Sequence, residues 1–408
     1  MTTTTASPAF TLPSSAPAAA RTVLGLLRRL RTGTLDVQLF DGTQVHFGTR
    51  RDGEPHAAIR LLDWSVCTDV LRRGDIGFAE AYIDGRWTTP DLAGLLRLCI
   101  ANRHALEEVV YGTWWGSLLD RVRHLLNRNS RRGSRRNIHA HYDLGNPFYR
   151  LWLDETMNYS SAWFEGDFSK PLPQAQHAKV ARALREIGAA PGQRLLEIGC
   201  GWGALAEAAT KDFGASFVGV TLSTEQLAWA RERMQRLGTA ERADLRLQDY
   251  RDIGDGPFDG IASIEMFEAV GREYWGDYFR GVQRLLRPGG RACIQSIVIR
   301  DDLFERYARS TDFIQQYIFP GGMLPSRETF RAEAARAGLK VVTEHAFGPD
   351  YAETLRRWRH DFLAREAEVR RLGFDTAFLR TWEFYLAYCE AAFDTGNTDV
   401  VQFTLQRP

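Results

Sequence analysis

One nine-residue stretch constrains the fold of this chain more than any other: Leu195-Leu196-Glu197-Ile198-Gly199-Cys200-Gly201-Trp202-Gly203. Its apolar beginning predicts a short buried strand, its alternate glycines predict a tight turn, and residues 204–213 have the composition of a helix. Gly199, Gly201 and Gly203 let the backbone approach a ligand that a Cβ would keep away, and the start of the helix offers free N–H groups. The stretch predicts a ligand-binding turn, although a turn that only connects the two elements has a similar composition.

The glycine spacing narrows the kind of ligand. A dinucleotide fingerprint needs a third glycine farther into the helix, so a pyrophosphate site is the weaker interpretation. An acidic residue followed by Gly-x-Gly-x-Gly resembles the first motif of class I S-adenosylmethionine-dependent methyltransferases. In that family the loop runs beside the methionine part of the cofactor, and Glu197 at the strand end is placed to hold a cation or a hydroxyl.

The rest of the C-terminal region alternates between strand and helix patterns. The expected strands are Arg194–Ile198, Ser216–Thr221, Asp244–Leu247, Phe258–Ile264 and Arg291–Val298. Helices are expected between the first four strands and at Tyr274–Leu286, and Pro288-Gly289-Gly290 should break the chain before the last strand. This pattern predicts an α/β fold with a doubly wound, Rossmann-like parallel sheet covered on both faces, whose ligands bind at the carboxyl ends of the strands.

The N-terminal region predicts a smaller α+β domain over residues 21–126, after an uncharged tail at 1–20 that we expect to be disordered. A basic amphipathic helix begins at Arg21, and such a helix either lies on an anionic membrane or packs on its own domain. The segment Leu35–Phe47 alternates like two strands around an Asp41-Gly42 turn, which predicts a hairpin, and a further strand is expected at Ile59–Asp63.

Residues 127–137 contain five arginines and separate this region from a second domain at 138–408. Such a run indicates a solvated linker or a contact with phospholipid headgroups, since arginine binds phosphate through two parallel hydrogen bonds. Aromatic residues do not interleave with the arginines, and the net charge of the chain is +1, so no nucleic-acid partner is expected.

Cysteine and histidine usage excludes further classes. The five cysteines form no Cys-x-x-Cys pair, which indicates a reducing, cytoplasmic environment and no zinc site. His139 and His141 are the only close histidine pair and have no cysteine or carboxylate cluster around them, so no metal is predicted. No apolar run approaches the roughly 20 residues that span a bilayer, so an integral membrane protein is not expected.

Polar residues follow the second and third predicted strands. Most class I methyltransferases carry an acidic residue after the second strand for the ribose hydroxyls, but this chain has Thr221-Leu222 there, so Thr221 and Gln226 would have to substitute. Ser223 and Gln226 also have the spacing of a helix capping box, which alone would explain both side chains. Tyr250 stands where an adenine ring is expected, and ordinary half-buried packing is its alternative.

Six separated motifs make the resemblance more specific, and together they look like the cyclopropane fatty acid synthase family. They are His141-Tyr142-Asp143-Leu144-Gly145-Asn146, Met157-Asn158-Tyr159-Ser160-Ser161-Ala162, residues 197–203, Gly219-Val220-Thr221-Leu222-Ser223, Met266-Phe267-Glu268, and Tyr317-Ile318-Phe319-Pro320-Gly321-Gly322 with Leu324-Pro325-Ser326. The resemblance covers nearly the whole chain, and the N-terminal domain resembles the lipid-associated domain of the phospholipid-acting members.

The resemblance implies that the chain transfers the methyl group of S-adenosylmethionine to a cis double bond in an unsaturated acyl chain of a phospholipid, forming a cyclopropane. A cytoplasmic protein bound peripherally to the inner membrane face follows from that substrate, and the oligomeric state, a homodimer included, is left open. An alkene is a poor nucleophile, so the site must align it with the methyl group and exclude water from the carbocation that results. A base must then remove a proton so that the ring closes.

In that family the base is assigned to a bound bicarbonate. The matching positions here are Glu268, Tyr351 and Ile297, while two positions depart: Ser161 stands for a cysteine and Gln295 for a histidine. Ser161 matters little if the contact is its backbone N–H. Gln295 can donate a hydrogen bond but carries no positive charge, so bicarbonate should bind more weakly, by roughly 1–2 kcal/mol.

A cation without a base at its methyl group can shift a hydride, so a methylene- or methyl-branched product is the alternative to cyclopropane. Cys389 matches a cysteine discussed as catalytic in the family, but a thiol in an apolar helix is inert unless its pKa is lowered, so we expect it to line the pocket. Tyr159 and Ser160 match cofactor contacts. Two other hypotheses stay open: an amine N-methyltransferase of the plant type, and a lipid-binding protein that has lost its chemistry.

Overall fold

The structure is a computed structural model that describes residues 16–106 and 144–408. The chain divides into two compact units, Met1–Leu119 with Thr376–Phe384, and Asp120–Asp375 with Tyr385–Pro408. The linker predicted at 127–137 and the pair His139 and His141 lie outside the described residues, as does most of the predicted tail. The predicted domain boundaries therefore stay predictions, and the division adds that helix α17 contributes residues to both units.

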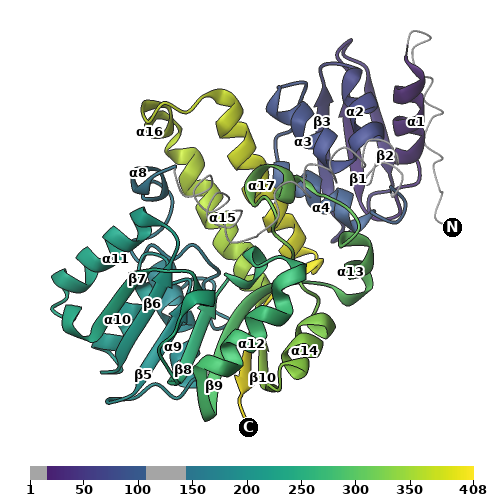
Figure 1. Ribbon diagram of the computed structural model, residues 1–408. Helices are drawn as coiled ribbons and strands as arrows, with labels where there is room; N and C mark the ends of the chain where they lie inside the picture. The colour runs from purple at the N-terminus through teal and green to yellow at the C-terminus, as the bar shows by residue number, and fades with distance from the viewer. Residues whose placement is uncertain (1–15, 107–143) are drawn as a thin grey trace. The chain divides into compact units, whose positions relative to one another are not determined.

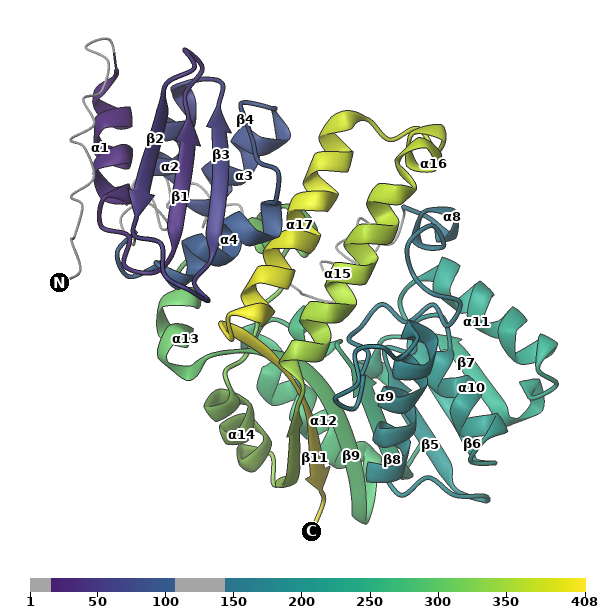
Figure 2. The same ribbon diagram turned by 180° about the vertical axis from the view of Figure 1, so that it is seen from behind.

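The first unit contains a four-stranded sheet in the order β2-β1-β3-β4, which Figure 2 labels. Its elements are α1 (Ala18–Leu27), β1 (Thr34–Gln38), β2 (Gln44–Gly48), β3 (His56–Leu61), α2 (Ser65–Arg73), α3 (Asp75–Ile83), β4 (Trp87–Thr88) and α4 (Leu92–Ala101). The hairpin expected around Asp41-Gly42 is present as the antiparallel pair β1 and β2. The strand expected at Ile59–Asp63 lies earlier, at His56–Leu61, and pairs parallel to β1.

Helix α1 corresponds to the predicted basic amphipathic helix, but it starts three residues earlier and ends before the arginines at 28, 29 and 31. Leu24 and Leu26 are buried within the protein. The apolar face of α1 is therefore used for packing, which favours the alternative that this helix packs on its own domain.

The second unit is built on a seven-stranded sheet in the order β10-β11-β9-β8-β5-β6-β7. Its strands are β5 (Arg194–Ile198), β6 (Ser216–Thr221), β7 (Ala243–Leu247), β8 (Phe258–Ile264), β9 (Leu286–Ile299), β10 (Lys340–Ala346) and β11 (Thr398–Gln406). Its helices are α8 (Asn146–Tyr149), α9 (Leu172–Glu186), α10 (Ala204–Lys211), α11 (Thr224–Arg236), α12 (Trp275–Leu285), α13 (Asp301–Tyr307), α14 (Arg327–Arg336), α15 (Gly348–Ala364), α16 (Glu366–Arg371) and α17 (Thr376–Asp394) (Figure 1).

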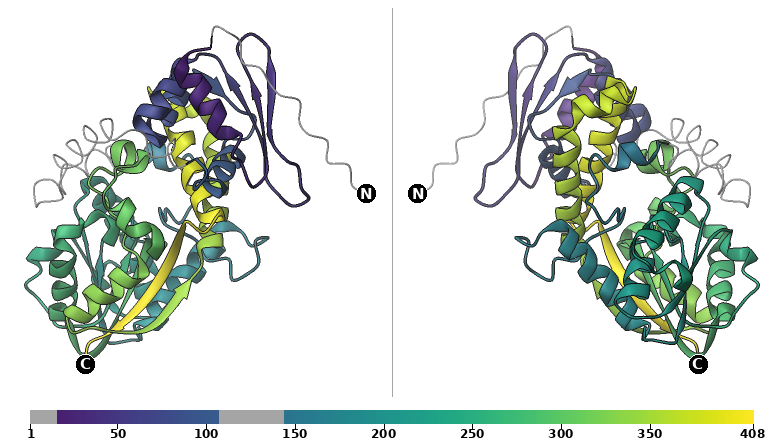
Figure 3. Two further views of the ribbon diagram at one scale, coloured as in Figure 1. Left: turned by 90° about the vertical axis from the view of Figure 1, so that its right-hand side faces the viewer. Right: turned by 90° about the vertical axis from the view of Figure 1, so that its left-hand side faces the viewer.

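The predicted α/β sheet is confirmed, with three differences in detail. Strand β11 runs antiparallel to both β9 and β10. In Figure 3, β11 is the yellow strand and β10 the lime one. The connection from β7 to β8 contains a 3₁₀ turn, Tyr250–Asp252, instead of the expected helix. Pro288-Gly289-Gly290 does not break the chain before β9, because β9 runs from Leu286 to Ile299 and accommodates these residues where its register with β8 shifts.

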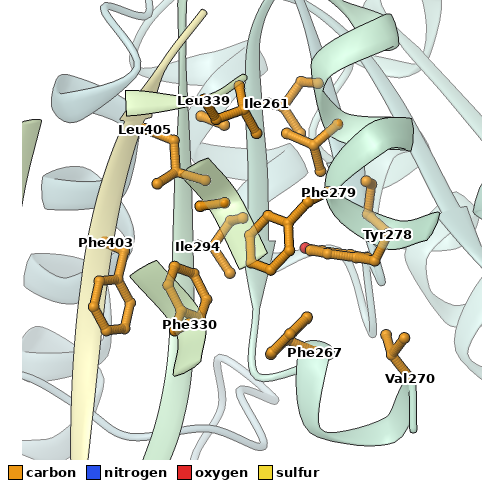
Figure 4. Packing of buried hydrophobic residues seen from close by; sticks show 14 of the residues in the cluster. Ile261, Phe267, Val270, Tyr278, Phe279, Ile294, Phe330, Leu339, Phe403 and Leu405 are labelled. Carbon is orange, nitrogen blue, oxygen red and sulfur yellow. The ribbon is translucent and has the colours of Figure 1, made fainter. Parts of the chain in front are cut away.

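Helices cover both faces of the sheet, as the alternation of elements requires. Helices α9, α10 and α11 share one hydrophobic cluster with residues of β5, β6 and β7. Helices α12 and α14 pack on the other face, where Phe267, Phe279, Phe330 and Phe403 form an aromatic group (Figure 4). The rings of Phe330 and Phe403 stack with centroids 3.9 Å apart. This packing fixes the strand ends at which the site described below is built.

The described residues contain neither a membrane-spanning helix nor a cluster of metal ligands. Within 16–106 and 144–408, no helix combines the length and the apolar composition that crossing a bilayer requires. In the same residues, no group of three histidine, cysteine or carboxylate side chains is arranged to hold a metal ion.

Candidate active site

A first cavity opens at the carboxyl ends of β5, β6 and β8, and we call it the cofactor cavity. It brings together most of the residues predicted to bind the cofactor: Tyr159, Ser160, Glu197, Gly199, Gly201, Thr221, Leu222, Gln226 and Tyr250. Gly203 does not line it. The position agrees with the rule that ligands of open α/β sheets bind outside the carboxyl ends of the strands.

The glycines of the loop after β5 serve two purposes. Gly199 has a φ of +87°, and a Cβ there would lie 2.8 Å from Cγ of Met266, so only glycine fits beside the cavity. Gly203 is the N-cap of α10 with a φ of +83°, and a Cβ there would lie 3.0 Å from Cβ of Ala230. Gly203 therefore lets α10 and α11 approach, and its role in cofactor binding stays a prediction.

The pair Thr221 and Gln226 occupies the end of β6 as predicted. Oγ1 of Thr221 donates a hydrogen bond to Oε1 of Gln226 at 3.0 Å, and both side chains are buried. Ser223 caps α11 by accepting from the backbone N–H of Gln226, but the Gln226 side chain does not return the bond, so the predicted capping box is only half formed. The side chain of Gln226 therefore bonds to Thr221 and lines the cofactor cavity instead of capping the helix.

Glu197 carries an unsatisfied oxygen beside the glycine loop. Its side chain is buried, and Oε2 has no hydrogen-bond partner among residues 16–106 and 144–408. Burial raises the pKa of Glu197 to about 8, against the opposing effect of the Lys179 charge. A buried carboxylate oxygen without a partner is costly, so this atom is placed to accept a hydrogen bond from a ligand.

A second cavity adjoins the first, and we call it the aromatic cavity. Its rings come from Tyr159, Tyr307, Phe319, Tyr351, Tyr385, Tyr388 and Phe393, and Leu324, Leu355 and Ile314 add aliphatic surface. Tyr159, Glu265 and Ala269 line both cavities, so the two meet at these residues. The aromatic cavity is mostly apolar, and its carboxyl groups are Glu265, Glu268 and Asp312.

Glu268 lies in the aromatic cavity, in a 3₁₀ turn after β8. Its Oε1 accepts a hydrogen bond from the backbone N–H of Ile297, whereas its Oε2 has no partner within the part of the chain that the structure describes. Burial raises the pKa of Glu268 to about 8, and the charge of Glu265 adds to the rise. Glu268 and Ile297, which both match positions of the family's bicarbonate site, therefore lie together, but they are hydrogen-bonded to each other.

The other three positions of the predicted bicarbonate site, Ser161, Gln295 and Tyr351, converge on Glu265. The sequence analysis did not single out this residue. Its Oε1 accepts from the backbone N–H of Ser161 at 2.9 Å and from Nε2 of Gln295 at 2.7 Å. Its Oε2 accepts from the hydroxyl of Tyr351 at 2.6 Å. Burial raises the pKa of Glu265, and these three donors together with the Lys179 charge oppose that rise.

The orientation of the Gln295 amide follows from its neighbours. Oε1 of Gln295 accepts from Nε2 of Gln402 at 3.0 Å, which leaves Nε2 of Gln295 to donate to Glu265. The two glutamines face each other in the register of β9 and β11. Ser161 acts through its backbone as predicted, because its hydroxyl donates instead to the carbonyl of Ala162 at 2.8 Å.

The backbone at Glu265 is unusual. Its φ is +50°, a region that residues other than glycine seldom adopt and that costs of the order of 1–3 kcal/mol. The hydrogen bond from its N–H to the carbonyl of Gln295, at 2.8 Å, holds this conformation. A sequence signal was available: Glu265 is the first residue after the predicted strand Phe258–Ile264, where functional side chains of parallel sheets gather.

The structure also gives the contacts of three further predicted site residues, Tyr159, Ser160 and Cys389. The Tyr159 hydroxyl pairs with that of Tyr385 at 2.7 Å, and the Ser160 hydroxyl accepts from Nζ of Lys179 at 2.5 Å. Cys389 lines the aromatic cavity, and burial raises the pKa of its thiol, as expected for pocket lining. Lys179 itself, buried on α9, was not predicted from the sequence.

This arrangement suits the transfer of an electrophilic carbon to an apolar substrate. The cofactor cavity offers a glycine loop and an unpaired carboxylate oxygen, the aromatic cavity offers rings that attract a cation, and two buried carboxyl groups lie near their junction. Glu265 and Glu268 differ in environment. Such a difference lets one carboxyl group transfer a proton while the other stabilises a charge.

Comparisons with known proteins agree with this geometry. A family model described as mycolic acid cyclopropane synthetase matches residues 129–403. The chain is 39% identical over 392 residues to a tuberculostearic acid methyltransferase of Mycobacterium tuberculosis, covering 94% of this chain and 90% of that protein. It is 33% identical over 366 residues to the cyclopropane-fatty-acyl-phospholipid synthase of Escherichia coli K12, covering 88% and 90%. A solved structure of the mycolic acid cyclopropane synthase CmaA1 with SAH and CTAB matches with a TM-score of 0.63 at 33% identity, over 67% of this chain and 98% of that one.

Proposed function

Since this chain belongs to the cyclopropane synthase family of S-adenosylmethionine-dependent methyltransferases, we propose that it methylates the cis double bond of an unsaturated phospholipid acyl chain and releases a methylene-branched product. The observation that carries this proposal is the convergence of Ser161, Gln295 and Tyr351 on the carboxylate of Glu265. The cyclopropane product that the sequence favours becomes the alternative outcome of the test.

The cofactor cavity fits S-adenosylmethionine by two features of this chain. Gly199 leaves space that a Cβ would fill, and Oε2 of Glu197 is unpaired. We assign Glu197, Gly199, Gly201 and the Thr221–Gln226 pair to its methionine and ribose parts, and Tyr250 to its adenine. When bound, the cofactor supplies a methyl group as an electrophile.

The aromatic cavity fits an acyl chain. Its rings and aliphatic side chains offer a dry surface to an alkene, and aromatic faces stabilise a nearby cation. Glu268 adds a carboxyl group whose Oε2 is unpartnered among the described residues. Burial raises its pKa to about 8, but a cation that forms on the acyl chain when the new bond to the methyl carbon is made favours the ionised carboxylate, which in turn stabilises that cation.

We propose that Glu265 is the base and takes the place of the bicarbonate that the family resemblance implies. Two of the groups expected to hold that anion, the Tyr351 hydroxyl and the Ser161 N–H, are already bonded to the Glu265 carboxylate, and Gln295 supplies the third donor. A third expected contact, the N–H of Ile297, is taken by Glu268. A built-in carboxylate also explains why a neutral glutamine suffices at position 295.

The identity of the product depends on whether Glu265 removes a proton before or after the cation rearranges. Three hydrogen bonds hold the Glu265 carboxylate in one orientation, and we propose that it meets the methyl proton only after the secondary cation has rearranged. A hydride moves from the methylated carbon to its neighbour, which places the positive charge on the methylated carbon. Glu265 then takes a proton from the methyl group, and the C–H electron pair forms an exocyclic C=C bond. A saturated methyl branch would need a further hydride and proton, which this reaction does not supply.

The test uses vesicles of an oleoyl phospholipid deuterated at both alkene carbons, with S-adenosylmethionine as methyl donor. The proposed path gives a vinylidene group with both deuterons on the neighbouring carbon, whereas cyclopropane keeps one deuteron on each ring carbon. Mass spectrometry with proton and deuterium NMR separates these isomers. High-field cyclopropane signals would contradict the proposed product, and the absence of any lipid product would contradict the substrate.

The role of Glu265 has its own test. Glu265→Ala removes the carboxylate and leaves three donors around the vacated space, so we expect product formation to fall by roughly 100-fold or more and to recover in part with added bicarbonate or formate. Glu232→Ala, at an exposed position on α11, is the matched control. A Glu265→Ala enzyme with unchanged turnover would contradict the assignment.

A further inference from the structure

Helix α9 carries a polar stripe on a face that is otherwise apolar. Gln176, Lys179 and Arg182 follow one another at intervals of three residues and so lie on one side of the helix. Gln176 and Lys179 have no solvent-exposed surface, and the side chain of Arg182 is 15% exposed. Burying such side chains costs free energy unless their contacts are used, so the stripe calls for an explanation.

The first part of the stripe holds the segment that carries one donor to Glu265. Nε2 of Gln176 donates to the carbonyl of Ser160 at 2.9 Å, and Nζ of Lys179 donates to the hydroxyl of the same serine at 2.5 Å. Lys179 also reaches Oδ1 of Asn158 at 3.3 Å. Ser160 is thus held at both its backbone and its side chain, and the next N–H along the chain, that of Ser161, is the one bonded to Glu265.

The other end of the stripe reaches the second donor. Arg182 donates to Oε1 of Gln402 at 2.7 Å, and Nε2 of Gln402 donates to the Lys179 carbonyl at 3.2 Å and to Oε1 of Gln295 at 3.0 Å. Gln295 in turn donates to Glu265. One helix face therefore supports two of the three donors of the Glu265 carboxylate by separate routes.

Lys179 also acts through its charge. The charged or titratable groups that face it are Glu265 after β8, Glu197 at the end of β5 and Asp154, and each of these carboxylates attracts its ammonium. Burial alone lowers the pKa of Lys179, which comes to about 8, so the ammonium is the main form at neutral pH. Glu268 and Tyr351 also face Glu265, and the Glu268 charge opposes ionisation there while Lys179 favours it.

The geometry points to a positioning role for this stripe: Gln176, Lys179 and Arg182 together hold the groups that aim the Ser161 and Gln295 donors at the Glu265 carboxylate. The inference rests on the proposed function of Glu265 as the base. It adds a requirement for residues that touch neither cofactor nor substrate carbon, and it assigns α9 to the reaction rather than to packing alone.

Lys179→Met tests the charge, because methionine has a similar length and no charge. Without the ammonium the pKa of Glu265 rises, so less carboxylate is present at a given pH. We expect turnover at pH 7 to fall roughly tenfold or more, and the acidic limb of the turnover–pH profile to move up by about one unit. Lys211→Met, at an exposed position on α10, is the control.

A purely structural role would lower the melting temperature without moving the acidic limb. Turnover within about twofold of the parent and an unmoved limb in a folded Lys179→Met protein would overturn the inference. If that variant does not fold, Arg182→Met decides, since its side chain is partly exposed: we expect a several-fold loss of turnover from misplacing Gln295, and unchanged turnover would overturn the inference.

Failure of this inference and failure of the proposed function have different signatures. If Glu265→Gln is inactive while Lys179→Met and Arg182→Met behave like the parent, only the role of the stripe is wrong. If Glu265→Gln keeps full turnover, the proposed base is wrong whatever the α9 variants do. Calorimetric titration with S-adenosylhomocysteine on each variant reports separately whether the cofactor cavity is intact.

Discussion

The cofactor cavity and the aromatic cavity share a wall but differ in how the chain builds them. Most of the first is assembled from the ends of β5, β6 and β8 with the segments that follow them and from the 3₁₀ turn after β7; residues 157–160 and Val180 of α9 complete it. The second draws on α13, α15, α17 and the irregular segment at 312–324, which are far apart in sequence. The first is therefore a property of local motifs, whereas the second depends on the packing of the whole unit.

The carboxylates show the same contrast. Glu197 in the cofactor cavity and Glu268 in the aromatic cavity each keep one oxygen without a partner, while Glu265, which lines both, has both oxygens bonded. A buried oxygen without a partner is a place where a ligand or a developing charge is expected. A fully bonded carboxylate is held in one orientation, as a base aimed at one proton must be.

The largest effect expected from this contrast concerns Glu268. Glu268→Gln removes the carboxyl group that can ionise beside the cation and keeps an oxygen for the Ile297 N–H. We expect turnover to fall about 10²–10³-fold with little change in affinity for S-adenosylhomocysteine, because Glu268 does not line the cofactor cavity. Single-turnover kinetics and calorimetry measure the two quantities, with Glu232→Gln as the exposed control. Equal losses in affinity and turnover would remove the distinction between the cavities.

The same variant should stabilise the ligand-free protein at high pH. The pKa of Glu268 is raised to about 8 in the folded protein, so between pH 5 and 8 the unfolded chain releases a proton that the folded chain keeps. The free energy of unfolding therefore falls as pH rises through this window. Glu268→Gln cannot ionise, so its advantage in unfolding free energy over the parent should be about 3–4 kcal/mol larger at pH 8 than at pH 5. Urea denaturation at both pH values checks this, and a gain independent of pH would contradict it.

The sequence predicted the cofactor cavity better than the aromatic one, for physical reasons. The strands β5, β6 and β8 have the predicted bounds, and the loops after them follow from local pattern. Glu265 was missed because its role depends on a left-handed backbone and on donors 86 and 104 residues away, at Tyr351 and Ser161. The Gln402–Gln295 contact likewise required the register of β11, an antiparallel strand that the alternation of elements did not predict.

A smaller effect is expected in the cofactor cavity. Gln226→Ala removes the acceptor of the Thr221 hydroxyl and one predicted ribose contact, and we expect affinity for S-adenosylhomocysteine to fall roughly tenfold, about 1.4 kcal/mol, with turnover at saturating cofactor nearly unchanged. Gln235→Ala, exposed on the same helix, is the control. A loss of turnover at unchanged affinity would place Gln226 in the reaction rather than in cofactor binding.

The smallest effect is expected at Cys389. The family resemblance raises a catalytic role for this residue, but the thiol lines the aromatic cavity, and burial raises its pKa, so little nucleophilic thiolate is available. Cys389→Ala removes only apolar contact, and we expect kcat/KM for lipid vesicles to stay within about threefold of the parent. A large loss of kcat in Cys389→Ala with unchanged lipid binding would instead show that the thiol takes part in the reaction and that the aromatic cavity does more than bind the acyl chain.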